Sequence, residues 1–173
     1  MRWTVITAAT VMAGGLFSPM ASAATAPAAA PGPVQAAACD KPCDRTIKDD
    51  YPYKSTPNVR DPWNFWTGQC TSFVAWRINK RLGIKFTNAY KDVLWGNAKD
   101  WDDAAKKAGM KVDGKPKVGD IAVWNSGTYG HIAYVASIDG TKIVVEEYNY
   151  SKPLAYTKRT IAADTVDNFI HFF

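Results

Sequence analysis

The sequence lacks any run of like charges, although its formal net charge is +5. Its 21 basic and 16 acidic residues are interspersed, which does not indicate nucleic acid as a partner. The mild basic excess suits attraction to an anionic surface such as a cell wall or a membrane. The chain also lacks an internal repeat and a separate wall-binding module. With 173 residues, it predicts one folded domain once a leader is removed.

No apolar run is long enough to span a membrane, which needs roughly 20 residues. The run at residues 4–17 is shorter, and two glycines interrupt it. Arg2 precedes this run, and an Ala-Ser-Ala site follows it at residues 21–23. This pattern predicts a secretory signal peptide over residues 1–23 and no transmembrane anchor. We therefore expect a secreted protein, either extracellular or associated with the cell wall.

Cysteine is scarce, and its count is odd. An exported protein with three cysteines leaves one of them unpaired. Cys39 and Cys43 are close enough to bridge across a Pro-containing turn, which predicts a disulfide between them. A metal site on these two cysteines is the alternative, but no histidine or further cysteine lies nearby to complete four ligands. The disulfide would lie in an N-terminal extension, residues 39–59, after an Ala/Pro-rich linker, residues 24–38.

Cys70, which that pairing leaves free, stands at the start of a predicted helix. Apolar residues recur at helical spacing after it and predict a helix that ends near Gly83: Phe73, Val74, Ile78 and Leu82. With Thr67 or Gly68 as N-cap, the sulfur would lie in the first turn, where unpaired N–H groups favour a thiolate and can hold an oxyanion. The alternative is that Cys70 is a small buried hydrophobe.

The remaining pattern predicts an α+β domain. A second helix is expected over residues 97–108, because Asp102 and Asp103 stand four residues before Lys106 and Lys107 and Gly109 can end it. Trp95 and Trp101 should pack this helix against the core. Four strands rich in Val, Ile, Tyr and Phe follow, with Asp139-Gly140 as a hairpin turn, over residues 120–124, 131–138, 142–150 and 167–173. We expect an antiparallel sheet with the Cys70 helix across one face.

Histidine is limited to His131 and His171, so there are few candidates for a general base. His131 begins a predicted strand directly after residues 127–130, a glycine-containing turn that allows the backbone to approach another element closely. His171 lies between Ile170 and Phe172, which indicates a structural role in apolar surroundings. His131 is therefore the better candidate base.

Strand alternation separates two adjacent carboxylates, Glu146 and Glu147. Glu147 shares a face with Val145 and Asn149, which we expect to be the face packed against the Cys70 helix and against His131. Glu146 would then face solvent. The alternative for Glu147 is an exposed carboxylate at a strand end. A cysteine, a histidine and a carboxylate or amide are together suited to nucleophilic acyl transfer.

Five blocks of sequence resemble the CHAP family, the cysteine, histidine-dependent amidohydrolases/peptidases. They occur in the order found in the family and cover about residues 60–150: 66–77 (WTGQCTSFVAWR), 95–101 (WGNAKDW), 118–124 (VGDIAVW), 129–135 (YGHIAYV) and 145–149 (VEEYN). Their order makes the resemblance specific, whereas a single Gly-Gln-Cys would be weak evidence.

The resemblance implies a papain-like α+β catalytic domain over residues 60–173 that hydrolyses amide bonds in the peptide part of peptidoglycan. It implies Cys70 as nucleophile, His131 as base, Glu147 as the third residue and Asn149 as polar support. Gln69 would help to bind the oxyanion. We expect no cofactor and no metal, because the acidic cluster before the cysteine of calcium-binding relatives is not reproduced by the scattered residues Asp49, Asp50 and Asp61. We expect the protein to act as a monomer.

Sequence alone leaves several functions open. The enzyme could be an N-acetylmuramoyl-L-alanine amidase or an endopeptidase on stem or cross-bridge peptides. It could also be an amidase or toxin acting on foreign walls or soluble peptides. A non-catalytic wall-binding protein on the same fold, with Cys70 merely buried, is the alternative of a different class.

Overall fold

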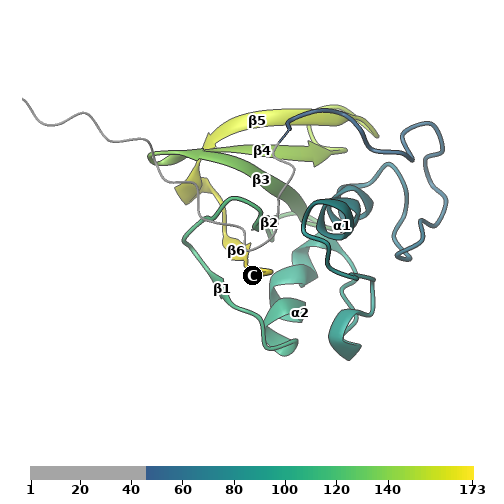
Figure 1. Ribbon diagram of the computed structural model, residues 1–173, viewed down its shortest axis with the longest axis horizontal. Helices are drawn as coiled ribbons and strands as arrows, with labels where there is room; N and C mark the ends of the chain where they lie inside the picture. The colour runs from purple at the N-terminus through teal and green to yellow at the C-terminus, as the bar shows by residue number, and fades with distance from the viewer. Residues whose placement is uncertain (1–45) are drawn as a thin grey trace, which may run out of the picture. The chain divides into compact units, whose positions relative to one another are not determined.

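A computed structural model describes residues 46–173 of the protein (Figure 1). The predicted signal peptide, the linker and the Cys39–Cys43 disulfide lie outside the described residues. Within residues 46–173, none of the helices combines the length and the apolar character needed to cross a membrane.

A six-stranded antiparallel sheet forms the centre of the described part, as expected. Its spatial order is β1-β6-β2-β3-β4-β5. The strands are β1 (Val112–Asp113), β2 (Ile121–Trp124), β3 (His131–Asp139), β4 (Lys142–Tyr148), β5 (Tyr156–Ala162) and β6 (Asn168–Ile170). The predicted Asp139-Gly140 turn joins β3 to β4, with Asp139 paired to Lys142. The sequence pattern missed β1 and β5.

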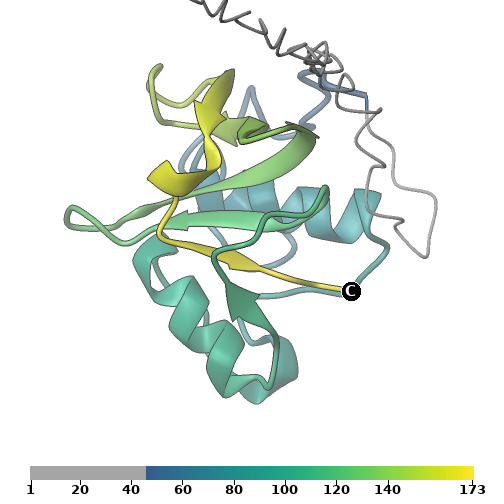
Figure 2. The same ribbon diagram turned by 90° about the vertical axis from the view of Figure 1, so that its left-hand side faces the viewer.

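Two α-helices pack around this sheet. α1 (Cys70–Arg81) lies along β3 and β4, and α2 (Trp101–Lys107) lies beside β1 and β6 (Figures 1 and 2). Both predicted helices are confirmed, although the first turn of the second is the 3₁₀ helix η2 (Ala98–Asp100). Two further 3₁₀ turns are η1 (Tyr90–Asp92) and η3 (Ala163–Thr165). Trp95 and Trp101 are fully buried in the core, as predicted.

Alternation along the strands divides the core between the two faces of the sheet. The face covered by α1 carries Ile132 and Tyr134 of β3 and Tyr148 of β4, which pack with Phe73 of α1. The opposite face carries a smaller apolar cluster: Ala122, Ala133, Val135, Ile143, Val145, Val166 and Phe169. His131 and Glu147 share the parity of this second set, so the expectation that Glu147 lies on the face covered by α1 is wrong.

The expectation that Glu146 faces solvent is also wrong, because Glu146 faces α1 and is fully buried. Its Oε1 accepts hydrogen bonds from Arg77 Nη2 at 2.6 Å and from the Tyr156 hydroxyl at 2.9 Å, and its Oε2 pairs with Arg81 Nη1. Arg77 and Arg81 stand one turn apart on α1 and are themselves buried. A carboxylate without these two cations could not remain buried at tolerable cost.

The described part of the predicted N-terminal extension packs on this same network. Arg77 also pairs with Asp50 at 2.7 Å and donates to the Lys48 carbonyl at 2.9 Å. Tyr51 is fully buried, with its ring centroid 4.8 Å from that of Tyr148 and 5.8 Å from that of Phe73. Residues 46–51 therefore contribute to the core of the domain.

His171 lies away from the candidate site, but its surroundings are not the apolar ones we expected. Its Nε2 lies 2.9 Å from Asp113 Oδ1 and its Nδ1 lies 3.0 Å from Asp120 Oδ1. Burial raises the pKa of Asp120 to about 7, against the opposing effect of His171. His171 thus lies between a carboxylate of β1 and a carboxylate of the turn before β2.

Candidate active site

Cys70 is the first residue of α1, as predicted, and is partly exposed. The N-cap, however, is Gln69 in an extended conformation, with no side-chain cap, rather than Thr67 or Gly68. Thr67 is unavailable for capping because its hydroxyl is hydrogen-bonded to the Val59 backbone. The sulfur still lies in the first turn, where helix N–H groups have no intrahelical partner.

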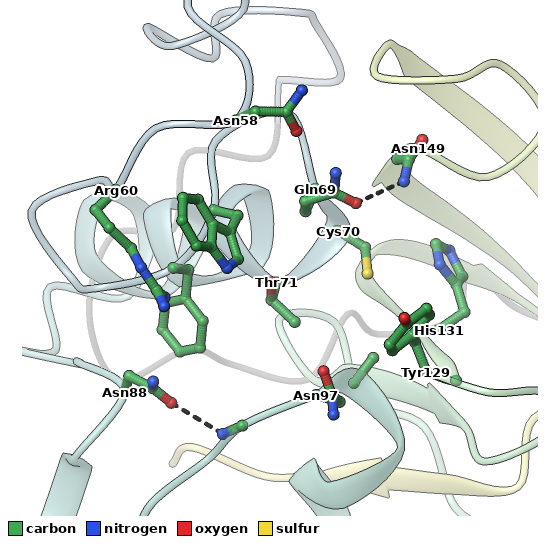
Figure 3. Close-up of a pocket in the computed structure, with 15 residues that line it drawn as sticks. Asn58, Arg60, Gln69, Cys70, Thr71, Asn88, Asn97, Tyr129, His131 and Asn149 are labelled. Carbon is green, nitrogen blue, oxygen red and sulfur yellow. Dashed lines mark hydrogen bonds between the residues drawn. The ribbon is translucent and has the colours of Figure 1, made fainter.

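His131 is held opposite Cys70 by the turn that precedes β3. Gly130 has φ +68°, and a Cβ on it would lie 2.6 Å from the backbone nitrogen of Lys99. Lys99 N–H also donates to the Tyr129 carbonyl at 3.0 Å. The predicted close approach of this turn to another element is therefore confirmed, and it fixes the start of the strand that carries His131. Figure 3 shows the Cys70 sulfur directed towards the His131 ring.

The imidazole of His131 bridges Cys70 and Glu147. Its Nε2 lies 2.9 Å from Glu147 Oε2, which leaves Nδ1 as the nitrogen available to Cys70. Burial by itself lowers the pKa of His131, but hydrogen bonding to Cys70 and Glu147 outweighs this effect and raises it to about 9. The geometry therefore favours a protonated His131 imidazole next to the Cys70 sulfur at neutral pH.

Glu147 is fully buried, and its carboxylate is held from its far side by β5. Arg159 donates Nε to Oε1 at 2.7 Å and Nη2 to Oε2 at 3.0 Å, and the Thr157 hydroxyl donates to Oε1 at 3.1 Å. Burial raises the pKa of Glu147, but the hydrogen bonds from His131 and Arg159 outweigh this and keep it below its usual value. The bidentate arginine fixes both the charge and the orientation of the carboxylate.

The sequence pattern did not indicate Arg159 and Thr157, because it did not predict β5, the strand on which they lie. The signal was present in the sequence, since β-branched residues recur between Tyr156 and Ala162 and Pro153 precedes them in a turn. Two aromatic rings also flank His131, with centroids at 4.5 Å for Tyr150 and 5.6 Å for Trp124. Packing against these two rings restricts the orientations that the His131 imidazole can adopt beside Cys70.

Asn149 lies near this chain of residues but contacts Gln69 instead of His131. The strand ends at Tyr148, and Asn149 adopts φ +55°, so its side chain no longer follows the alternation of β4. Its Oδ1 accepts from Leu154 N–H at 2.8 Å, and its Nδ2 donates to Gln69 Oε1 at 2.6 Å (Figure 3). This fixes the orientation of the Gln69 amide, because Oε1 is engaged and Nε2 remains free to donate.

A cleft of about 900 Å³ opens over Cys70. Its lining includes Gln69, Cys70, His131 and Asn149 of the predicted site, together with neutral polar and aromatic residues: Asn58, Trp66, Thr71, Asn88, Asn97 and Tyr129. Glu147 lies behind His131 and is not part of the lining. Among residues 46–173, no group of three or more His, Cys, Asp or Glu side chains could hold a metal ion.

Comparison with known proteins places this arrangement in a family. The model of the CHAP domain matches residues 60–149, which include Gln69, Cys70, His131, Glu147 and Asn149. The chain belongs to the CHAP family. The resemblance expected from the five sequence blocks is therefore confirmed.

Two curated proteins similar to this chain come from staphylococci. The chain is 40% identical over 111 residues to the staphylococcal secretory antigen ssaA2 of Staphylococcus aureus, which is 62% of this chain and 38% of that protein. It is 41% identical over 127 residues to the N-acetylmuramoyl-L-alanine amidase sle1 of Staphylococcus haemolyticus, which is 69% of this chain and 36% of that protein. The chain thus spans less than two fifths of the length of these relatives.

A solved CHAP structure supports the fold. The crystal structure of an N-acetylmuramoyl-L-alanine amidase from Staphylococcus aureus is similar with a TM-score of 0.52 and 28% identity, over 60% of this chain and 30% of that one. The predicted papain-like α+β fold is confirmed.

Proposed function

We propose that this protein is a secreted peptidoglycan hydrolase that cleaves an amide bond of the wall peptide. The observation that carries the proposal is the Cys70–His131–Glu147 chain at the edge of an open cleft. Membership of the CHAP family and the amidase names of two similar proteins support peptidoglycan as the substrate. The predicted leader and the similarity to a secretory antigen support export.

In the first half of the proposed reaction, the Cys70 thiolate attacks the carbonyl carbon of the scissile amide. The resulting oxyanion accepts hydrogen bonds from Gln69 Nε2 and from N–H groups at the start of α1. His131 then transfers the proton on Nδ1 to the leaving nitrogen as the C–N bond breaks. The products of this half are a free amine and a thioester on Cys70.

In the second half, water attacks the thioester carbonyl and gives a proton to His131 Nδ1. The C–S bond breaks, and the carboxylic acid leaves as the thiolate–imidazolium pair is restored. Glu147 touches only the far side of the imidazole, so its role is to position His131 and to stabilise its charge. Asn149 positions Gln69 in the same indirect way.

Digestion of purified peptidoglycan tests the proposed function. Mass spectrometry of the released fragments should show new amino and carboxyl termini at one amide bond. Release of free stem peptides would identify a muramoyl–L-alanine amidase, and cleavage within stem or cross-bridge peptides would identify an endopeptidase. A folded wild-type protein that releases no fragment from own or foreign walls would contradict the proposal.

The pH dependence of turnover tests the role of Glu147. The pKa of His131, raised to about 9, places the alkaline limit of kcat/KM near that pH, because the imidazolium must be present to protonate the leaving amine. Glu147→Gln removes the negative charge that supports the imidazolium, so the limit should move to lower pH while kcat falls. The pH profile of kcat/KM on a soluble muropeptide measures both effects.

Two neighbouring variants serve as controls for this shift. Thr157→Val removes one hydrogen bond but keeps the carboxylate charge, so the alkaline limit should stay near its wild-type position. Arg159→Gln removes a positive charge that pairs with Glu147 beside the imidazolium. Without it the Glu147 charge supports the His131 imidazolium more strongly, so the alkaline limit should move to higher pH. An unchanged limit in Glu147→Gln would show that Glu147 does not act through the imidazole.

A further inference from the structure

A short hairpin forms one wall of the cleft. Arg60 and Trp66 face each other in an antiparallel bridge, and a turn at residues 61–65 connects them. Thr67 N–H donates to the Val59 carbonyl at 2.8 Å and continues the pairing away from the turn. The wall is therefore a defined backbone structure rather than a loose loop.

Asp61 joins this hairpin to the helix that carries Cys70. It is only 6% exposed, and its Oδ1 accepts from the N–H groups of Trp63 at 2.9 Å and Phe65 at 2.8 Å. Its Oδ2 accepts from the Ser72 hydroxyl at 2.5 Å, and Ser72 stands two residues after Cys70 on α1. The hairpin is thus held in a fixed position relative to the sulfur.

Arg60 is presented by this hairpin towards the cleft. Its guanidinium lies 4.0 Å from the centroid of the Trp66 ring, and Nη1 donates to the Asn64 carbonyl at 2.8 Å. In the part of the chain that the structure describes, Arg60 forms no salt bridge: the charge of adjacent Asp61 acts on it through space, but the Asp61 oxygens accept from the turn N–H groups and from Ser72. The remaining guanidinium donors are available to a ligand.

The charge of the cleft makes this arginine distinctive. The residues that line it include no aspartate or glutamate, and Arg60 is their one permanent cation. Figure 3 shows Arg60 at one end of the cleft and His131 at the other, with Cys70 beside His131. A peptide bound across Cys70 would therefore place residues on one side of its scissile bond near Arg60.

We propose that Arg60 binds a free carboxylate of the substrate peptide and makes the enzyme selective for acidic over amidated wall peptides. The inference rests on the proposed function and specifies its substrate. A planar guanidinium held by Trp66 and the Asn64 carbonyl is preorganised for a carboxylate, with little entropy left to lose. A neutral carboxamide at the same position lacks the charge and would gain much less.

Two muropeptides that differ only in whether the glutamyl α-carboxyl is free or amidated test the proposal. We expect wild-type kcat/KM to be about tenfold higher for the free acid, the size of one charge-assisted hydrogen bond in a solvated cleft. Arg60→Gln should lose the preference, because activity on the acid should fall by about tenfold and activity on the amide by much less. Lys142→Gln, which removes an exposed cation at the β3–β4 turn, should keep the wild-type preference.

Binding measurements separate this proposal from the proposed function. Calorimetry with Cys70→Ser, with and without Arg60→Gln, gives the affinity ratio for the same two peptides without turnover. If wild-type protein cleaves neither peptide, the proposed function fails, and the affinity ratio still decides the role of Arg60. A preference that survives Arg60→Gln in turnover or in binding, or a wild-type protein without any preference, would overturn the role of Arg60.

Discussion

Cys70→Ser is expected to abolish hydrolysis of peptidoglycan and to leave the fold intact. A serine hydroxyl beside His131 does not ionise as a thiol does, so the attacking group is lost while its hydrogen bond is kept. We expect kcat/KM to fall by about four orders of magnitude or more, the scale seen when a hydrolase loses its nucleophile. The fall in turbidity of a wall suspension and the appearance of new amino termini measure the loss.

The fold of this variant needs its own measurement. Cys70 is partly exposed at the start of α1, so the melting temperature should change by only a few degrees. Iodoacetamide should label Cys70 in the wild-type protein at neutral pH, which a merely buried cysteine would resist. Wall digestion at the wild-type rate by Cys70→Ser would refute the nucleophile assignment.

Glu146→Gln is expected to produce the largest loss of stability of the substitutions considered. The carboxylate is the shared partner of Arg77 and Arg81, all three side chains being almost completely buried. Removing its charge leaves Arg81 without an ion-pair partner among residues 46–173, whereas Arg77 keeps Asp50. Breaking a buried pair in this way costs on the order of 3 kcal/mol, or roughly 10 °C in melting temperature. Thermal unfolding followed by circular dichroism measures the change.

Glu147→Gln is the matched control, since it is the same chemical change one residue along β4. Its partners can adapt: His131 can lose its proton, and Arg159 reaches solvent with 26% of its side chain exposed. Glu147→Gln should therefore lose turnover with a smaller loss of stability, whereas Glu146→Gln should keep much of its turnover at low temperature. The double variant Glu146→Gln/Arg81→Gln should recover part of the lost stability, because the uncompensated charge is removed. Equal melting temperatures for wild type and Glu146→Gln would contradict this account of the network.

The contrast between Glu146 and Glu147 shows which features of the site could be predicted from the sequence. Alternation correctly grouped Glu147 with the face of His131, and helical spacing correctly put Cys70 at a helix start. Alternation distinguishes two faces of a strand but does not say which one a helix covers. The helix sequence did not indicate the covered face either. Arg77 and Arg81 contact Glu146 on that face, but arginines on a helix are normally assigned to its exposed side.

The polar contacts around the site could not be predicted from strand alternation or helical spacing. Asn149 left the strand geometry through a positive φ, so its contact with Gln69 could not follow from alternation. Arg159 reaches Glu147 from a strand that contains charged residues and lacks a long apolar run. Contacts of this kind depend on the pairing of β4 with β5, a tertiary fact that local preference does not contain.

The packing of Tyr51 and Asp50 has a consequence for how this domain can move between proteins in evolution. The family match begins at residue 60, whereas Tyr51 fills the space between Phe73 and Tyr148, and Asp50 neutralises Arg77. A recombination junction at residue 60 would transfer most of the cleft without Asn58, and it would leave a cavity in the core and Arg77 without one of its two carboxylate partners. The segment that must be inherited together is therefore longer than the one that the family model matches, and successful fusions should have their junctions before Asp50.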